Sequence, residues 1–408
     1  AFDWDRHLAH VSNIYDMLLP YILTGGKLNE DALGIRESGN GIPDLIDEAR
    51  NEVDFFLSIR DGEAYSQGVT NPCNDWSVMF QAGCTTMAAW ANAANCAVIA
   101  EAFRLNHNDT LQQYYTNEAI KAFRFASKQE NQQLDDLQDV GSMQMRGRDF
   151  RQMAAAFLYN LTGDEQWERL MVEESMIKDN KSLLFSKGRH GFFGVGVMHE
   201  EGKNLVPFCQ YWAAAAYLTC PQPRHYSEFY QNLKACVNAQ AEAYNYGHVA
   251  NRPSRRAAND SRWQTSQNLQ LVMLAHYIGD KARRQQLEHI MYTEAGWAMG
   301  RNPGNIVEMT GLGERHITDV YTTGRNDGTP ESHPGQTPFN GTETWSPGHN
   351  GGDARILLNQ MYPSWTDGGW PRQESYFNQR YFWVNGEFTP RETMRGKMAL
   401  LAYLYAIR

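Results

Sequence analysis

The sequence predicts an all-α fold, an (α/α)6 barrel with six inner and six outer helices. Three observations support this prediction: twelve segments with apolar residues at helical spacing, short loops bearing Gly, Asn or Pro between them, and little of the alternation typical of strands. A solenoid of helical pairs is the competing architecture, but its repeats recur every ~34 to 47 residues. No such period is found, and we expect a single barrel domain over residues 1–408.

The predicted helices follow one another along the whole chain. In the second, Pro43 suits the first turn, and Leu45, Ala49 and Val53 begin an apolar stripe. The third is rich in alanine, which is typical of a tightly packed helix. The twelve segments are residues 8–23, 43–59, 82–105, 111–128, 149–161, 165–178, 207–218, 227–244, 264–278, 281–299, 353–361 and 390–407.

Residues 300–390 differ from the rest of the chain. They are rich in Gly, Pro, Asn, Thr and Trp and carry little helix signal. A flexible linker would not be so aromatic, and long ordered loops usually carry function. We therefore expect much of the functional site to be built from this segment.

Composition excludes several classes of function. The net charge of −10 argues against nucleic acid as a partner, because a phosphate-binding surface needs clustered Lys and Arg. No run of about 18 apolar residues predicts a membrane span. The opening residues AFDWDR show neither the basic start nor the apolar stretch of a signal peptide. The oligomeric state is left open by the sequence.

The sequence shows neither a cysteine-pair motif nor a metal-binding motif. The six cysteines form no CxxC pair, and we expect buried free thiols, with Cys84, Cys96 and Cys209 inside apolar helices. Neither a zinc spacing nor an EF-hand loop is found. No cofactor is expected to be required; a structural calcium ion is possible, but no metal ligands can be assigned.

Acidic residues near both ends of the chain are candidates for catalysis. Asp3 and Asp5 stand directly before the first helix, where capping is the alternative explanation. Glu387 follows the aromatic run 381–384 (YFWV) and precedes the last helix. An apolar pocket keeps a carboxyl protonated, as a general acid requires, although a solvent-exposed loop glutamate would also fit the pattern.

Hydrolysis of a glycosidic bond needs two carboxyl groups, and Asp3 and Glu387 could supply them. In inverting enzymes they stand roughly 6.5–9.5 Å apart, which leaves room for the attacking water. In a closed barrel the first and last helices are neighbours. The two residues are therefore expected to face each other across one cleft.

Four blocks of the chain resemble glycoside hydrolase family 9, the family of many endoglucanases. The most specific is 37–50 (ESGNGIPDLIDEAR), which resembles the family's ESGNGIPDLLDEA. Residues 148–164 resemble the family's helix pair, which carries the motifs DEF and ATGD. Residues 297–313 contain GRNP and TGLG and resemble the family segment that contains LLGRNP and TGFG. The block 385–387 (NGE) resembles its acid-bearing NE, with Gly386 inserted.

This resemblance implies an inverting β-1,4-glucanase with Asp3 as base and Glu387 as acid. Residues 2–6 (FDWDR) resemble the family's Asp-Ala-Gly-Asp motif from its second position, so a second aspartate is expected before Ala1. Glu392 and Glu374 are the fallback acids. An upstream immunoglobulin-like domain, common in the family, is expected to be missing.

Several residues are expected to bind the glycan. His333, in the loop 323–335, matches the family's HPHHR region, and Arg325 is inferred from the sequence alone. Aromatic rings can stack on sugar faces or fill the core, and both uses remain open for them. The candidate platforms are Trp263, Trp383 and Tyr381, with Trp345, Trp365 and Trp370 as further possibilities.

Two other functions remain open at this point. An exo-acting β-glucosaminidase on chitosan oligosaccharides would share the mechanism, and a carbohydrate-binding protein without catalysis would explain the absent second aspartate. A helical scaffold for protein partners is disfavoured by the resemblance, and it would show a solenoid period, which is not found. A polymeric substrate also implies a secreted or periplasmic location.

Overall fold

The computed structural model describes most of the 408-residue chain. The described residues are 7–70, 79–140, 144–186, 206–242, 268–302, 304–307, 309–320, 333–337, 362, 378 and 398–408. The chain divides into two compact units. The first comprises Ala1–Phe192, Val197–Gln240 and Tyr405–Arg408, and the second comprises Phe193–Gly196 and Ala241–Leu404.

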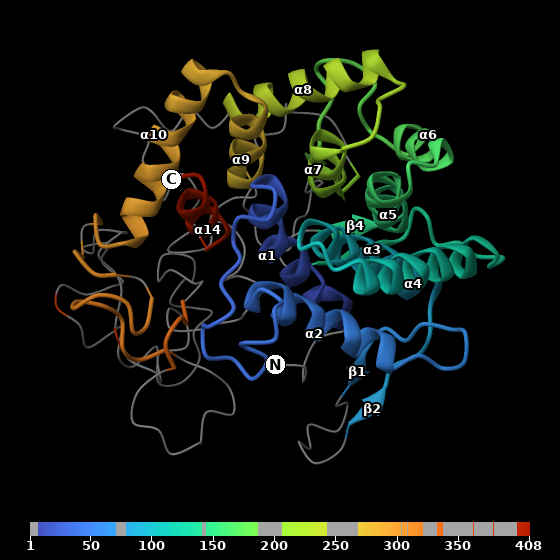
Figure 1. The fold of residues 1–408 in the computed structure, drawn as a ribbon, viewed down its shortest axis with the longest axis horizontal. Coiled ribbons are helices and arrows are strands. Elements are labelled where there is room, and N and C mark those ends of the chain that lie inside the picture. The colour runs from blue at the N-terminus through green and yellow to red at the C-terminus, as the bar shows by residue number, and fades with distance from the viewer. Residues whose placement is uncertain are drawn as a thin grey trace. The chain divides into compact units, whose positions relative to one another are not determined.

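Helices dominate the described part of the first unit (Figure 1). A short 3-10 helix, η1 (His7–His10), leads into the first of them. They are α1 (Ser12–Leu23), α2 (Asp44–Ser58), α3 (Thr86–Leu105), α4 (Asp109–Ser127), α5 (Gly147–Thr162), α6 (Glu165–Glu173), α7 (Tyr211–Thr219) and most of α8 (Ser227–Glu242).

Burial separates these helices into an inner and an outer set. Nearly every residue of α1, α3 and α7 is buried, and α3 is buried without interruption from Met87 to Phe103. By contrast α4 and α6 bury one side only, for example Ala119 and Phe123 in α4 and Trp167 in α6. Helix α5 is also mostly buried. Since α3 packs against α1, α4 and α5, and α5 packs against α6 and α7, inner and outer helices alternate from α3 to α7. Figure 1 shows α3 and α4 running side by side.

The strands of the first unit are short and form only two-stranded antiparallel pairs among the described residues. They pair β1 (Val69–Thr70) with β2 (Phe80–Gln81), β3 (Leu137–Asp139) with β4 (Gln144–Arg146), and β5 (Phe185–Ser186) with β6 (Phe208–Cys209). These pairs lie in connections between helices and do not alter the all-α class.

The second unit contains α9 (Asn268–Ile278), α10 (Lys281–Ala298) and most of α14 (Ala399–Ala406). The α9–α10 pair is held to α14 by His276, whose Nδ1 lies 2.8 Å from the Tyr403 hydroxyl and whose Nε2 lies 3.1 Å from Glu288. Burial lowers the pKa of His276, so its imidazole is neutral near neutral pH.

The helical periodicity is confirmed for eleven of the twelve predicted segments; the remaining segment, 353–361, lies outside the described residues. Four boundaries were wrong by four or five residues. Helix α1 begins at Ser12 rather than residue 8, because His7–His10 forms a 3-10 helix. Helix α3 begins at Thr86 rather than residue 82, because Cys84 forms an isolated bridge with Ser66 and Thr85 caps the helix. Helix α7 begins at Tyr211 because Phe208–Cys209 pairs with β5. Helix α6 ends at Glu173, five residues early, and the amide of Met176 instead donates to Gln210 Oε1.

The cysteine prediction is confirmed in part. Cys84, Cys96, Cys209, Cys220 and Cys236 are free thiols, and the last four are buried. Two placements were wrong: Cys84 is exposed ahead of α3, and Cys209 lies on β6 rather than in a helix. Cys73 lies outside the described residues.

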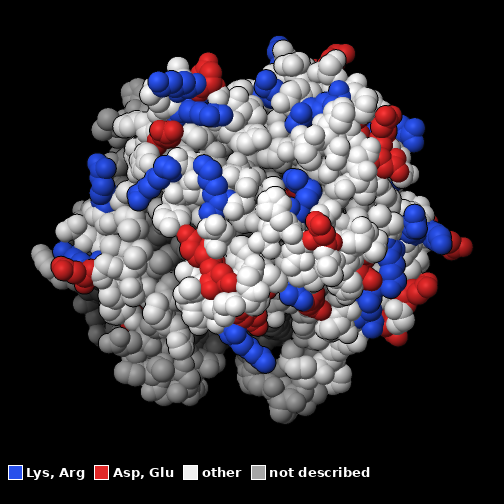
Figure 2. All heavy atoms as spheres, in the orientation of Figure 1, with Lys and Arg blue, Asp and Glu red and all other residues white. Residues whose placement is uncertain are grey.

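Charged side chains of both signs lie on the described surface (Figure 2). Toward the side of Figure 2 where α3 to α6 lie, basic and acidic side chains are interspersed, with no broad field of one sign. Of the helices that the structure describes, none combines the length and apolar character that crossing a membrane requires.

Candidate functional site

One of the predicted site residues, His333, lies in the described part of the chain. It is exposed at the start of the turn 333–337 in the second unit. The other predicted site residues and the two fallback acids lie outside the described residues. They are Asp3, Glu387, Arg325, Trp263, Trp383, Tyr381, Glu392 and Glu374. The described residues nonetheless define the loops that carry or flank several of them.

The His333 turn is fixed to the TGLG motif by Thr310. The buried Thr310 hydroxyl donates to the His333 carbonyl at 2.5 Å and accepts from the Gln336 amide at 2.9 Å. The Thr310 amide donates to the Gln336 carbonyl at 3.0 Å, and the Gly335 amide donates to the Thr310 carbonyl at 2.9 Å. Two motifs that the sequence analysis treated separately therefore form one structure, which we term the Thr310 clamp.

Gly311 is required at its position in the clamp for two reasons. Its φ is +72°, in the left-handed region that side chains with a Cβ rarely adopt. A Cβ built on Gly311 would also lie 2.8 Å from Pro334 Cβ, inside normal van der Waals distance. Any larger residue would push Pro334, and with it the neighbouring His333, away from the motif.

The GRNP motif turns the chain out of α10 toward the clamp. Gly300 has φ +102°, and the Arg301 amide donates to the Gly296 carbonyl at 2.8 Å. Asn302 Nδ2 donates to the Ile306 carbonyl at 2.8 Å, and Asn302 Oδ1 accepts from the Ile306 amide at 3.3 Å. The asparagine therefore closes a turn through its side chain, which explains why an amide is needed there.

Both flanks of the segment that bears Glu387 are attached to this same loop. Upstream, Asn378 Oδ1 accepts from the amides of Thr318 and Asp319 at 3.0 and 2.9 Å. Downstream, the residues at the start of α14 pack on a small apolar cluster under the clamp. The cluster comprises Ala298, Val307, Met309, Leu312, Met398 and Leu401. The segment between Asn378 and Met398 thus begins and ends on the loop that holds His333.

In the first unit, the ESGNG turn before α2 is organised around two aspartates. Asp31 accepts from the amides of Gly39 and Gly41 at 2.6 and 2.7 Å, and both glycines have φ near +90°. The Gly41 and Gly39 amides lower the pKa of Asp31 because they favour its charged form. Asp44 accepts from the Leu33 amide and the Ser38 hydroxyl at 2.6 and 2.8 Å. The block that resembles family 9 most closely is thus a structural turn.

Buried polar groups between α1, α2 and α3 were missed by the sequence analysis. Tyr15 donates to Asn95 Oδ1 at 2.5 Å, and both residues are buried. Glu52 is 9% exposed, and burial raises its pKa to about 8 while Asn13 opposes that rise. The sequence signal was available, because Glu52 lies on the buried side of α2 beside Val53 and three residues after Ala49.

A metal centre is not formed by the described residues. Among them, no three His, Cys, Asp or Glu side chains converge in a way that could hold an ion. A structural calcium ion stays a prediction that nothing tests.

The chain is similar to several known proteins. The sequence pattern of glycosyl hydrolase family 9 matches residues 13–381, and no curated protein sequence matches the chain significantly. Among solved structures, a family 9 protein from Bacteroides ovatus superposes with a TM-score of 0.67 at 17% identity, covering 98% of this chain and 70% of that one.

Two further solved structures are similar. A thermostable endoglucanase from Alicyclobacillus acidocaldarius, carrying the substitution D468A, superposes with a TM-score of 0.65 at 15% identity, covering 98% and 72% of the two chains. Endoglucanase CelQ from Clostridium thermocellum, complexed with cellotetraose, gives 0.57 at 14% identity, covering 97% and 61%. The chain therefore has the (α/α)6-barrel fold of these structures, and the predicted fold class is confirmed.

Proposed function

Since the chain belongs to glycosyl hydrolase family 9 and is a glycoside hydrolase, we propose that it cleaves internal β-1,4 bonds of a glucan with inversion. Asp3 is the base and Glu387 is the acid in this proposal. The proposed reaction uses two carboxyl groups and a water molecule and needs no cofactor.

In the proposed mechanism Asp3 removes a proton from a water molecule that attacks the anomeric carbon. Glu387 protonates the glycosidic oxygen as the bond to the leaving sugar breaks. The attack and the departure occur on opposite faces of the ring, so the product has the inverted anomeric configuration. General acid catalysis of this kind contributes about 10²- to 10⁴-fold to the rate.

The observation that carries the proposal is the attachment of both flanks of the Glu387 segment to one loop. Asn378 bonds to Thr318 and Asp319, and Met398 packs in the cluster under the Thr310 clamp. The same clamp presents the exposed His333. A fixed scaffold of this kind is what a catalytic acid and a sugar-binding histidine need, because small displacements weaken catalysis strongly.

The substrate class is supported by the family and by one of the similar structures. The endoglucanase that is complexed with cellotetraose binds a β-linked glucan fragment. We extend this binding to the present chain, with Arg325, Trp263, Trp383 and Tyr381 joining His333 in contacts with the sugars. A polymeric glucan cannot enter a cell, so we further propose that the protein acts outside the cytoplasm.

Rates on soluble β-glucan test the catalytic assignment. We expect Glu387→Gln to lower kcat about 10²- to 10⁴-fold, and Asp3→Asn to lower it comparably. Glu392→Gln is the matched control, since it removes a carboxyl five residues later. Loss of activity in Glu392→Gln but not in Glu387→Gln would contradict the assignment of the acid.

The endo-acting mode has its own measurement. Viscosity of a soluble glucan should fall early, when few reducing ends have formed. A constant viscosity with steady release of single sugars would contradict endo action. Cleavage of chitosan oligosaccharides with no cleavage of glucan would instead favour the exo-acting β-glucosaminidase.

A further inference from the structure

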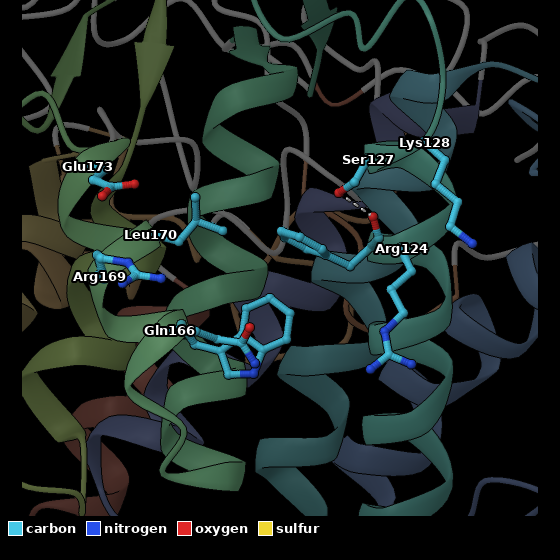
Figure 3. A pocket seen from close by; sticks show the side chains of 9 residues that line it. Arg124, Ser127, Lys128, Gln166, Arg169, Leu170 and Glu173 are labelled. Carbon is cyan, nitrogen blue, oxygen red and sulfur yellow. Dashed lines mark hydrogen bonds between the residues drawn. The ribbon is translucent and has the colours of Figure 1, made fainter.

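A pocket of about 380 Å³ lies on the first unit between the outer helices α4 and α6 (Figure 3). It involves none of the residues assigned to hydrolysis. The residues that line it are Phe123, Arg124, Ser127 and Lys128, at the C-terminal end of α4, with Gln166, Trp167, Arg169, Leu170 and Glu173 of α6.

The floor of the pocket is aromatic and rigid. Phe123 and Trp167 are 7% and 8% exposed, and their rings meet edge to face with centroids 4.9 Å apart. Leu170 adds a half-buried aliphatic wall on α6. The Ser127 hydroxyl donates to the Phe123 carbonyl at 2.8 Å, which fixes that side chain against α4 (Figure 3). A ligand would therefore meet a preformed apolar surface.

The rim of the pocket is cationic. Arg124, Lys128 and Arg169 are exposed, and none of them has an ion-pair or hydrogen-bond partner for its side chain in the described part of the chain. Neighbouring cations differ, since Arg151 lies 2.8 Å from Glu174 and Lys121 lies 3.8 Å from Glu118.

The pocket is lined by one acidic side chain, compared with three cationic ones. Glu173 lies on α6, one turn after Arg169, but forms no ion pair with it among the described residues. The excess of positive charge stands out on a chain whose net charge is −10. An anionic group in the pocket would be held by charge-assisted hydrogen bonds.

We propose that this pocket binds an acidic saccharide, with one uronate carboxylate between the cations of the two helices and its ring against the apolar floor. A neutral sugar would leave the cations unused. A bare phosphate would leave the floor unused and fill little of the volume, which lies in the range of small-molecule sites. Gln166 and Ser127 supply polar contacts for the ring hydroxyls.

Such a site would let the enzyme bind a uronate-bearing polysaccharide that lies beside the glucan. The binding is independent of hydrolysis, so its test reads binding alone. Methyl β-D-glucuronoside and methyl β-D-glucoside differ only in a carboxylate replacing a hydroxymethyl group. They form a matched pair of probes for the full 408-residue chain.

The experiment is an NMR titration of each probe at low salt, with the variant Arg124→Gln/Arg169→Gln. The control Lys27→Gln/Arg36→Gln removes the same charge from exposed residues of the first unit that do not line the pocket. We expect the glucuronoside to bind at least tenfold more tightly than the glucoside. In the pocket variant the ratio of the two affinities should fall at least tenfold, and in the control variant it should stay unchanged.

Three results would overturn the proposal. Equal binding of the two probes would show that the carboxylate is not recognised. An unchanged preference in the pocket variant, with a native circular dichroism spectrum, would place the site elsewhere. If inorganic phosphate or an acidic peptide displaced the glucuronoside with an equal affinity, the pocket would be a general anion site and not a saccharide site.

Discussion

Substitution of Gly311 by alanine tests how tightly the Thr310 clamp fixes the His333 turn. At φ +72° a residue with a Cβ costs about 1–2 kcal/mol. The new Cβ would lie 2.8 Å from Pro334 Cβ, and such overpacking adds about 1–3 kcal/mol because the proline ring cannot rotate away. The clamp should therefore lose about 2–5 kcal/mol of local stability.

Two other glycines separate these two contributions. Gly313 has φ +75° with its nearest contact at 3.4 Å, and Gly335 has φ +88° with nothing within 4 Å of a built Cβ. Gly313→Ala and Gly335→Ala should each cost only the backbone contribution. The excess cost of Gly311→Ala is then about 1–3 kcal/mol, which corresponds to about 5- to 150-fold in an equilibrium constant.

Hydrogen exchange of the amides in the clamp measures this equilibrium directly. The amides of Thr310, Gly335 and Gln336 donate within the clamp, so their exchange reports its opening. We expect exchange in Gly311→Ala to be about 5- to 150-fold faster than in either control variant. The same exchange rate in all three variants would refute the packing argument, and no change in any of them would refute the clamp itself.

Three further substitutions test other interactions in the structure. Burial raises the pKa of Glu52 from 4.5 to about 8, so between these pH values the folded state keeps a proton that the unfolded state loses. The free energy of unfolding should therefore fall by about 4–5 kcal/mol from pH 4.5 to 8. Glu52→Gln should flatten that pH dependence, as measured by chemical denaturation. Asp149→Asn should cost about 3–5 kcal/mol of that free energy, because buried Arg146 donates to it at 2.7 Å, whereas a cost below 1 kcal/mol would contradict this. Thr310→Val should loosen the His333 turn by about 1–3 kcal/mol in hydrogen exchange and raise KM for glucan, since two backbone groups lose their partner.

Much of the helical fold could be predicted from the sequence because apolar periodicity is a local signal. The alanine-rich stretch of α3 is buried along nearly its whole length, as its composition indicates. Helix boundaries set by pairing with distant segments were missed. The start of α7 depends on β5, more than twenty residues upstream, and no local pattern at Phe208 reveals that pairing.

The candidate site could be predicted as a set of motifs but not as a structure. The TGLG and His333 motifs were identified separately, and their joining through Thr310 depends on contacts between residues 23 positions apart. The attachment of Asn378 to Thr318 spans 60 positions and has no sequence signature. Glu52 was missed for a different reason: its position on the apolar stripe of α2, three residues after Ala49, is a local signal that the sequence analysis did not use.

The stereochemistry of hydrolysis tests the central claim most directly. Anomeric proton NMR of soluble mixed-linkage β-glucan during digestion distinguishes the two configurations before they equilibrate. We predict immediate release of α-anomeric ends, and loss of that signal in Glu387→Gln. Initial release of β-anomeric ends would contradict the inverting mechanism, and an undiminished signal in the variant would contradict Glu387 as the acid.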